Sequence, residues 1–442
     1  MNSKVKTLNI AIAGLGTVGV GTIKILTENA AILSARTGVS FQVTAVSARD
    51  RHRDRGVDIA GLGWEDNSID LAARRDVDMV VELIGGSEGP ALALARATLG
   101  QGKSFVTANK ALIAHHGSEL AALAEEKGAE LRFEAAVAGG IPIIKALREG
   151  LAANQISGLY GILNGTCNYI LTRMEEEGLD FATVLDDAQR LGYAEADPTF
   201  DVDGIDTAHK TAILASLAFG VQPDMEQLAC EGIRNITSVD IQYASELGYR
   251  IKLLGVARLV EAPEGEPQAN PGVETRVYPA MVPLSSSLAQ VGGATNAVVV
   301  DGSYVGQTTY IGAGAGAGPT ASAVVADIID VVRGNSGPSL GVPAADLVAT
   351  KSVGSGTSEG TYYVRLRVTD RPGVMADITT ALGKENVSID SILQHDHAAE
   401  GGVYIVLTTH EASEAAVMAS ISRFTSLDSV LETPTMIRIE SF

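Results

Sequence analysis

Residues 8–19 read LNIAIAGLGTVG, a short apolar run followed at once by a glycine-rich loop. The residues after the loop, to about Arg36, have the apolar spacing of a helix, so we expect a strand, a tight loop and a helix in that order. Gly14 would permit the tight turn, Gly16 would let a pyrophosphate approach the backbone, and Gly19 would let helix and strand pack closely. The pattern predicts a dinucleotide-binding loop, with a merely structural turn as the alternative; its residues are Gly14, Leu15, Gly16, Thr17, Val18 and Gly19.

Further strand-like runs at 41–47, 79–84 and 104–107 alternate with helical patterns, which predicts an α/β fold with a mostly parallel sheet. We expect a Rossmann-type domain over 1–133 and an α+β domain with a mixed sheet over 134–317, with an apolar helix near 318–335. A linker rich in Gly, Ser and Pro would span 336–357. The segment 358–442 reads strand, helix, strand, strand, helix, strand.

Length and composition narrow the function classes. The 442 residues correspond to about three domains at ~150 residues each. The formal charge of −20 opposes binding of nucleic acid or anionic lipid over most of the surface. The two cysteines, Cys167 and Cys230, are too few for a disulfide framework. We therefore expect a cytoplasmic protein that binds neither nucleic acid nor membrane.

The residues after the second strand indicate which dinucleotide is bound. An acidic residue usually holds the ribose 2′-hydroxyl there, but this chain has Arg49, with Asp50 one position later. Arg49, helped by Arg51 and Arg53, could pair with a 2′-phosphate. The sequence thus favours NADP, with NAD possible, because a solvated charge run would look the same.

The segment 192–210, GYAEADPTFDVDGIDTAHK, holds five carboxylates within twelve residues. An EF-hand beginning at Asp201 would need Gly at 206 and Glu at 212, where the chain has Asp206 and Ala212, so that metal site is excluded. On a helix beginning near 203, Asp206 and Lys210 would share one face, and the ammonium could donate a proton to a carbonyl oxygen. The alternative is an ordinary surface ion pair.

Five motifs in order resemble the homoserine dehydrogenase family: the glycine loop, TANK (107–110), AAVAGGIPII (135–144), GILNGTCNYI (161–170) and the 192–210 segment. The resemblance implies reversible NAD(P)-dependent interconversion of L-aspartate 4-semialdehyde and L-homoserine, on the route to threonine and methionine. It implies Lys210 as general acid and Lys110 as a second lysine between nicotinamide and substrate. It also implies that the 134–317 domain serves substrate binding, catalysis and dimerisation, and that the helix near 318–335 returns to complete the Rossmann-type domain. The residues it implies for substrate are Glu195, Asp206, Tyr193, Asp201 and Thr166, and those it adds for the cofactor are Gly192 and Gly312.

The same resemblance implies a structural monovalent cation, typically Na⁺, on the main-chain oxygens of Glu134, Val137, Gly139 and Ile141. Carbonyl ligands leave no side-chain signature, and a simple Gly-Gly turn before Pro142 is the alternative.

The C-terminal segment, from TYYVRLRVTDRPGVMADITTALGKENV onward, resembles the ACT domain, a small ligand-sensing module. Backbone amides at a helix start could meet an amino acid's carboxylate. The residues implied are Asp370, Arg371, Pro372, Gly373, Val374 and Asn386. We expect a homodimer or homotetramer with L-threonine as inhibitor; a purely oligomerising tail is the alternative. Rivals for the whole chain are a nonenzymatic nucleotide or amino-acid sensor and a related amino-acid dehydrogenase.

Overall fold

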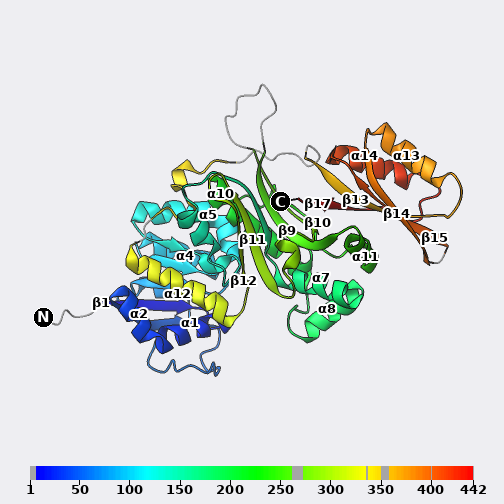
Figure 1. The fold of residues 1–442 in the computed structure, drawn as a ribbon. Helices are drawn as coiled ribbons and strands as arrows, with labels where there is room; N and C mark the ends of the chain where they lie inside the picture. The colour runs from blue at the N-terminus through cyan, green and yellow to red at the C-terminus, as the bar shows by residue number, and fades with distance from the viewer. Residues whose placement is uncertain (1–5, 261–271, 335–336, 350–357, 400, 442) are drawn as a thin grey trace.

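The computed structural model describes residues 6–260, 272–334, 337–349, 358–399 and 401–441, and Figure 1 shows three units along the chain. The first is a six-stranded parallel sheet in the order β3-β2-β1-β4-β5-β6, with helices on both faces, as expected for a Rossmann-type fold. Its elements are β1 (Lys6–Ala13), α1 (Thr17–Glu28), α2 (Ala30–Thr37), β2 (Val39–Ser47), β3 (Gly63–Trp64), α3 (Asp70–Ala73), β4 (Met79–Glu82), α4 (Pro90–Gly100), β5 (Ser104–Thr107), α5 (Lys110–Lys127) and β6 (Leu131–Arg132).

Strand order reverses between β1 and β4, because β1 leads through α1 to β2 on one side and β4 lies on the other. Ligands of such sheets bind at the carboxyl ends of the strands at this switch point. The loop after β1 is the glycine loop, so the fold places it at the expected ligand edge. The late helix α12 (Ala317–Arg333) packs on α1, and a Cβ at Gly21 would lie 2.9 Å from the carbonyl oxygen of Ala317.

The second unit is a mixed sheet with helices packed against it. Its central helix, α10, is buried along most of its length between the sheet and α5 of the first unit. Burial from Asp206 to Leu217 restricts the directions of the side chains on this part of α10. The elements are η1 (Glu134–Ala136), α6 (Ile143–Lys145), η2 (Ala146–Gly150), β7 (Ile156–Ile162), α7 (Gly165–Glu177), α8 (Phe181–Arg190), α9 (Thr199–Val202), α10 (Ile205–Phe219), β8 (Ala229–Cys230), α11 (Ser238–Glu246), β9 (Tyr249–Val260), β10 (Gly272–Pro283), η3 (Leu288–Gln290), β11 (Thr295–Gly302) and β12 (Gly306–Ala313).

The third unit has the βαββαβ order expected for an ACT domain. Its strands lie in the order β17-β13-β15-β14, and its two helices pack together. The expected fold class is thus confirmed for all three units. The elements are β13 (Glu359–Val368), α13 (Val374–Lys384), β14 (Ile389–Ala399), β15 (Gly402–Thr409), β16 (Ala412–Ser413), α14 (Glu414–Thr425) and β17 (Thr435–Ile439).

The ACT sheet continues directly into the sheet of the second unit. β17 pairs in parallel with β10 through Ala280 with Arg438 and Met281 with Ile439. The combined sheet has eleven strands. Figure 1 shows it crossing from the centre of the molecule into the ACT domain. Buried ion pairs reinforce the join: Arg276 contacts Glu414 at 2.6 Å, and Arg365 contacts Asp240 at 2.7 Å.

Part of the predicted linker is packed rather than free. Leu340 and Leu347 are buried in the core that the first two units share, and Val348 forms a β-bridge with Val221. This described segment, residues 337–349, contains a short 3₁₀ helix, η4 (Ala344–Asp346). Residues 336 and 350–357 of the predicted linker lie outside the described residues. Within the described part of the chain, no helix combines the length and the apolar character needed to cross a membrane.

Candidate active site

The glycine loop has the geometry that a dinucleotide requires. Gly14 has φ +100°, and a Cβ there would lie 2.4 Å from the carbonyl oxygen of Leu83. A Cβ at Gly19 would lie 2.1 Å from the oxygen of Gly14, so the helix can approach the loop only with glycine at 19. A Cβ at Gly16 would meet no atom within 4 Å, which leaves its outer side open to a ligand. The loop therefore fits a pyrophosphate at the start of α1.

A cavity of about 580 Å³ connects this loop with α10. One end is formed by Val18, Thr320 and the turn at Gly314–Gly316 before α12, and the other by charged and polar side chains. Of the predicted residues, the lining includes Val18, Lys110, Gly139, Thr166, Gly192, Tyr193, Asp201, Asp206 and Lys210. The fold thus brings the dinucleotide loop and the predicted catalytic residues to one cavity.

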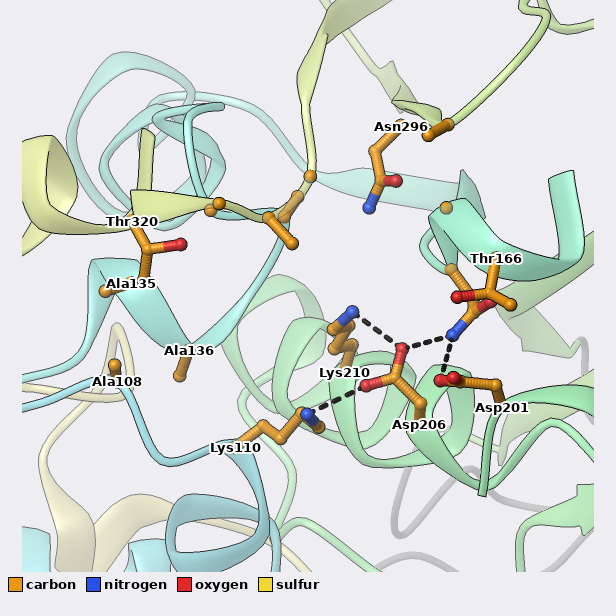
Figure 2. Close-up of a pocket in the computed structure, with 18 of the residues that line it drawn as sticks. Ala108, Lys110, Ala135, Ala136, Thr166, Asp201, Asp206, Lys210, Asn296 and Thr320 are labelled. Carbon is orange, nitrogen blue, oxygen red and sulfur yellow. Dashed lines mark hydrogen bonds and ion pairs between the residues drawn. The ribbon is translucent and has the colours of Figure 1, made fainter. Parts of the chain in front are cut away.

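Asp206 lies between the two predicted lysines (Figure 2). Its Oδ1 is 2.9 Å from Lys110 Nζ, and its Oδ2 accepts a hydrogen bond from Lys210 Nζ at 2.8 Å. Burial alone would raise the Asp206 pKa, but the ammonium groups of Lys210 and Lys110 hold it well below its usual range. The site therefore contains a permanent carboxylate bridging two cations, and the predicted pairing of Asp206 with Lys210 on one helix face is present.

Lys210 is oriented by two acceptors. Its Nζ donates to the carbonyl oxygen of Leu163 at 2.7 Å as well as to Asp206. An ammonium group has three N–H donors, so one remains for a ligand in the cavity. Lys110 is less enclosed: its side chain is 32% exposed and lies over the Phe200 ring, 5.3 Å from the centroid.

Asn164 joins the two carboxylates, and sequence reasoning missed it. Its Nδ2 donates to Asp201 and to Asp206, both at 2.8 Å, while its Oδ1 accepts from the backbone N–H of Cys167 and so caps α7. The cap position was recognisable, because Asn is a favoured N-cap residue and stands just before the helix. Its bonds to residues 37 and 42 positions later leave no local signal.

The predicted substrate residues are only partly gathered. Thr166 donates to the carbonyl oxygen of Tyr193 at 2.8 Å, and Tyr193 stacks on Tyr169 with centroids 4.5 Å apart. Asp201 faces the cavity, and its pKa is raised by burial. Glu195 is exposed and does not belong to the lining. Its backbone carbonyl accepts from Gln189 at 2.9 Å, which ties the segment to α8.

The predicted cofactor residues beyond the glycine loop differ in position. Gly312 lies within β12 and is not part of the lining, whereas Gly314 and Gly316 of the same run are. Arg49 follows β2 and is exposed, outside the cavity. Nearby, the guanidinium groups of Arg51 and Arg55 lie over the Trp64 ring at 5.8 and 5.9 Å from the centroid.

His209 and Cys167 are buried in ways that suit packing. Burial, with the neighbouring His115, lowers the pKa of His209 to about 4, so its ring is neutral at ordinary pH. The ring packs between His115 and Phe200, with centroids 5.3 and 5.5 Å away. Burial raises the pKa of Cys167 well above its ordinary value, so its thiol is a poor nucleophile.

The predicted cation ligands surround a turn with two left-handed residues, Ala138 at φ +53° and Gly139 at φ +41°. Within the described residues, the carbonyls of Val137 and Gly139 accept no hydrogen bond, while that of Ile141 accepts from Ile143 at 2.8 Å and that of Glu134 from Val137 at 3.4 Å. Two free carbonyls and two partly used ones are compatible with a monovalent cation.

The predicted regulatory residues lie at both ends of one helix. Asp370, Arg371, Pro372 and Gly373 form the exposed turn before α13, with Gly373 at φ +98° as its N-cap and Val374 as its first residue. Asn386, at φ +57°, follows the end of that helix. Eleven helical residues span about 16 Å at 1.5 Å per residue, so a single ACT domain keeps the two parts apart.

Comparison with known proteins agrees with this arrangement. Residues 14–134 match the family described as the NAD-binding domain of homoserine dehydrogenase, 142–329 match homoserine dehydrogenase, and 362–424 match the ACT domain. The chain is 45% identical to homoserine dehydrogenases from Neisseria gonorrhoeae, covering 99% of both chains, and Pseudomonas aeruginosa, covering 98% of this chain and 99% of the relative.

Solved structures agree as well. A homoserine dehydrogenase from Thiobacillus denitrificans superposes with a TM-score of 0.91 at 46% identity, covering 98% of each chain. A hyperthermophilic archaeal homoserine dehydrogenase in complex with NADPH gives a TM-score of 0.61 at 28% identity, covering 73% of this chain and 97% of that one. The chain therefore belongs to the homoserine dehydrogenase family, NAD(P)-dependent oxidoreductases that act on a CH–OH group.

Proposed function

We propose that this chain interconverts L-aspartate 4-semialdehyde and L-homoserine in threonine and methionine biosynthesis, with Lys210 as the general acid and base. The observation that carries the proposal is the Lys110–Asp206–Lys210 bridge at the end of the cavity that begins at the glycine loop. The bound dinucleotide supplies the hydride that reaches the aldehyde carbon. Reduction leaves negative charge on the aldehyde oxygen, and an ammonium group aimed at that oxygen stabilises and protonates it.

Lys210 suits this role because two of its three N–H groups are held by Leu163 and Asp206. The third N–H group gives its proton to the substrate oxygen during reduction. In the reverse direction, the neutral amine of Lys210 takes the proton of the homoserine hydroxyl. Asp206 stays ionised throughout and keeps both lysines in place. Lys110 adds a second cation next to the reacting oxygen.

The substrate's α-ammonium needs a carboxylate. We assign it to Asp201, which faces the cavity, with Thr166 and Tyr193 on the same wall. Glu195 is the second candidate, two residues after Tyr193, and reaches the ammonium only if the segment 192–197 shifts inward. Kinetics of the two variants separate these alternatives, as set out in the Discussion.

NADP is the proposed dinucleotide. Arg49 stands at the end of β2, where the ribose would lie, and the positive charges of Arg51 and Arg55 are held nearby over Trp64. An Arg49→Ala variant should lose most of its preference for NADPH over NADH, measured as the ratio of kcat/KM values. Retention of the full ratio would remove Arg49 from the site.

The proposed Na⁺ would be held by the carbonyls of Glu134, Val137, Gly139 and Ile141. Because this turn is part of the wall beside Gly314, an ion there would stiffen the cavity rather than take part in proton transfer. Its test is the thermal midpoint in NaCl against tetramethylammonium chloride at equal ionic strength, where specific binding raises the midpoint only in NaCl.

We also propose that the protein is a homo-oligomer that L-threonine inhibits through the ACT domain. A single ACT domain separates Asn386 from the Asp370–Gly373 turn, so a complete ligand site needs the turn of one copy beside Asn386 of another. The edge strand β12 carries the exposed Ile311, and the exposed Val305 directly precedes the strand, so a second copy could cover both side chains. The rate of semialdehyde reduction with and without threonine, together with the mass in solution, tests both parts.

A further inference from the structure

Asn296, the second residue of β11, forms part of the cavity wall and is only 1% exposed. Figure 2 shows its amide end directed into the cavity, on the side of Lys210. The backbone at Gly314 packs directly on this amide, because a Cβ at 314 would lie 2.1 Å from Asn296 Cγ. The side chain is therefore held in one position before any ligand binds.

The orientation of the amide follows from its partner. Asn296 Nδ2 donates to the carbonyl oxygen of Leu163 at 2.9 Å, the same oxygen that accepts from Lys210 at 2.7 Å. A carbonyl oxygen can only accept, so the NH₂ group must face Leu163, and the amide oxygen must face elsewhere.

That oxygen, Oδ1, is buried and has no hydrogen-bond partner among the described residues. A buried acceptor without a donor is destabilising, and native proteins keep very few of them. Such an atom at a cavity wall matches a ligand that brings an N–H or O–H donor, and the donor reaches it once the Gly314 backbone that covers the amide shifts.

We propose that Asn296 Oδ1 accepts a hydrogen bond from the carboxamide N–H of the nicotinamide ring and thereby orients the ring beside Lys210. This inference rests on the proposed function, in which the cavity holds the dinucleotide and Lys210 protonates the substrate. The other N–H donor present would be the substrate's ammonium, which is better matched by the carboxylate of Asp201. Asn296 instead adjoins the uncharged Gly314 turn, which leads to α12 and the glycine loop.

Asn296 and Lys210 share the carbonyl oxygen of Leu163 as hydrogen-bond acceptor. Because Asn296 and Lys210 are both fixed to that one oxygen, the ring that delivers hydride and the ammonium that delivers the proton are placed relative to the same atom. Asn296 is a binding residue in this scheme, and it takes no part in proton transfer.

The test compares NADP⁺ with its 3-acetylpyridine analogue. In the analogue a methyl ketone replaces the carboxamide, so the pyridine substituent has no N–H group to donate. Dissociation constants are measured by calorimetry for the full-length protein and for Asn296→Ala. We expect the unsubstituted protein to bind NADP⁺ about tenfold more tightly than the analogue, as for one hydrogen bond, and Asn296→Ala to bind the two within about twofold. 2′-Phospho-ADP-ribose, which lacks nicotinamide, is the control and should bind both proteins equally.

Equal binding of NADP⁺ and the analogue by the unsubstituted protein would overturn the inference without any variant. A tenfold preference that survives in Asn296→Ala would also overturn it. If homoserine affinity falls in Asn296→Ala while the preference survives, the acceptor serves the substrate and the carboxamide assignment is wrong. Failure to bind any nicotinamide dinucleotide would instead refute the proposed function itself.

Discussion

Lys210 lies one helical turn after Asp206 on α10, and its ammonium nitrogen is 2.8 Å from the aspartate oxygen Oδ2 in a buried site. An isolated pair at this spacing on a helix surface contributes only about 0.3–0.5 kcal/mol. Here both groups are inside the protein, and a second lysine binds the other oxygen. In the proposed mechanism, this pair holds Lys210 in place as the proton donor, so removing either group should lower turnover.

Lys210→Met should lower kcat by about 10²–10⁴-fold, the usual contribution of a general acid. The dissociation constant for NADPH should change by less than about twofold, because Lys210 acts on the substrate oxygen. Steady-state kinetics beside a fluorescence titration of NADPH check both values. Parallel loss of turnover and cofactor binding would contradict the assignment.

Asp201→Asn and Glu195→Gln separate the two candidates for the substrate's ammonium. We expect Asp201→Asn to raise the KM for homoserine by about tenfold or more, since a charge-assisted hydrogen bond contributes about 1.5–3 kcal/mol. Glu195→Gln should change it little if the segment stays open as described. The reverse order of the two effects would show that the segment 192–197 moves inward on binding substrate.

Phe200→Leu tests the contact of Lys110 with the aromatic ring. The substitution keeps an apolar side chain but removes the ring face, whose attraction for a partly exposed ammonium is about 0.5–1 kcal/mol. We expect kcat to fall about threefold in Phe200→Leu, because an energy of this size changes a rate by about that factor. Phe200→Tyr keeps the ring face and should keep nearly full activity. Equal loss in both variants would assign the effect to packing against His209 instead.

Asp327→Asn should change how stability depends on pH. Burial, with the nearby Glu134 carboxyl, raises the Asp327 pKa from 3.8 to about 8. Between these values the unfolded chain loses the proton and the folded protein keeps it, so rising pH lowers the free energy of unfolding. Asparagine does not titrate and can still accept from the Glu134 N–H, which now lies 2.7 Å from Asp327.

The variant should therefore gain stability relative to the unsubstituted protein as the pH rises from about 5 to about 8. Urea unfolding at both pH values measures this difference. A difference that stays constant with pH would show that Asp327 is ionised in the folded protein.

Arg276→Met should destabilise the join between the second unit and the ACT domain. It removes the buried partner of Glu414 and Glu274, and breaking a buried pair on one side costs about 3–5 kcal/mol. The matched control is Arg190→Met, because the Arg190 side chain of the Arg190–Asp187 pair is largely exposed. Urea unfolding measures the free energy of unfolding of both variants. Similar stability of the two variants would mean that the join contributes little.

Local patterns were sufficient for the parts of the molecule with local causes. The glycine loop was predictable because each glycine answers a steric demand within a few residues, and Asp206 with Lys210 because helical spacing alone brings them together. The βαββαβ order of the ACT domain followed from its alternating strand and helix patterns in the same way.

Features built from distant residues were not predictable. The bonds of Asn164, the wall position of Asn296 and the pairing of β17 with β10 depend on how separate elements pack, and no periodicity within any one segment encodes them. Glu195 is predicted in the site by its motif, but it does not belong to the lining, and its segment bonds to α8, a contact between residues that the motif does not encode. The burial of Leu340 and Leu347 within the predicted linker was likewise not predictable, because the core they enter is assembled from other segments.

The continuous sheet has a consequence for how the protein unfolds. β17 pairs with Ala280 and Met281 of β10, and the second unit's Arg276 and Asp240 each have an oppositely charged partner in the ACT domain, Glu414 and Arg365. Loss of the ACT fold would take these partners away from the buried side chains of Arg276 and Asp240, so the two domains stabilise each other. The second unit and the ACT domain should melt as one cooperative transition, and a weakness introduced in either would lower the melting temperature of both.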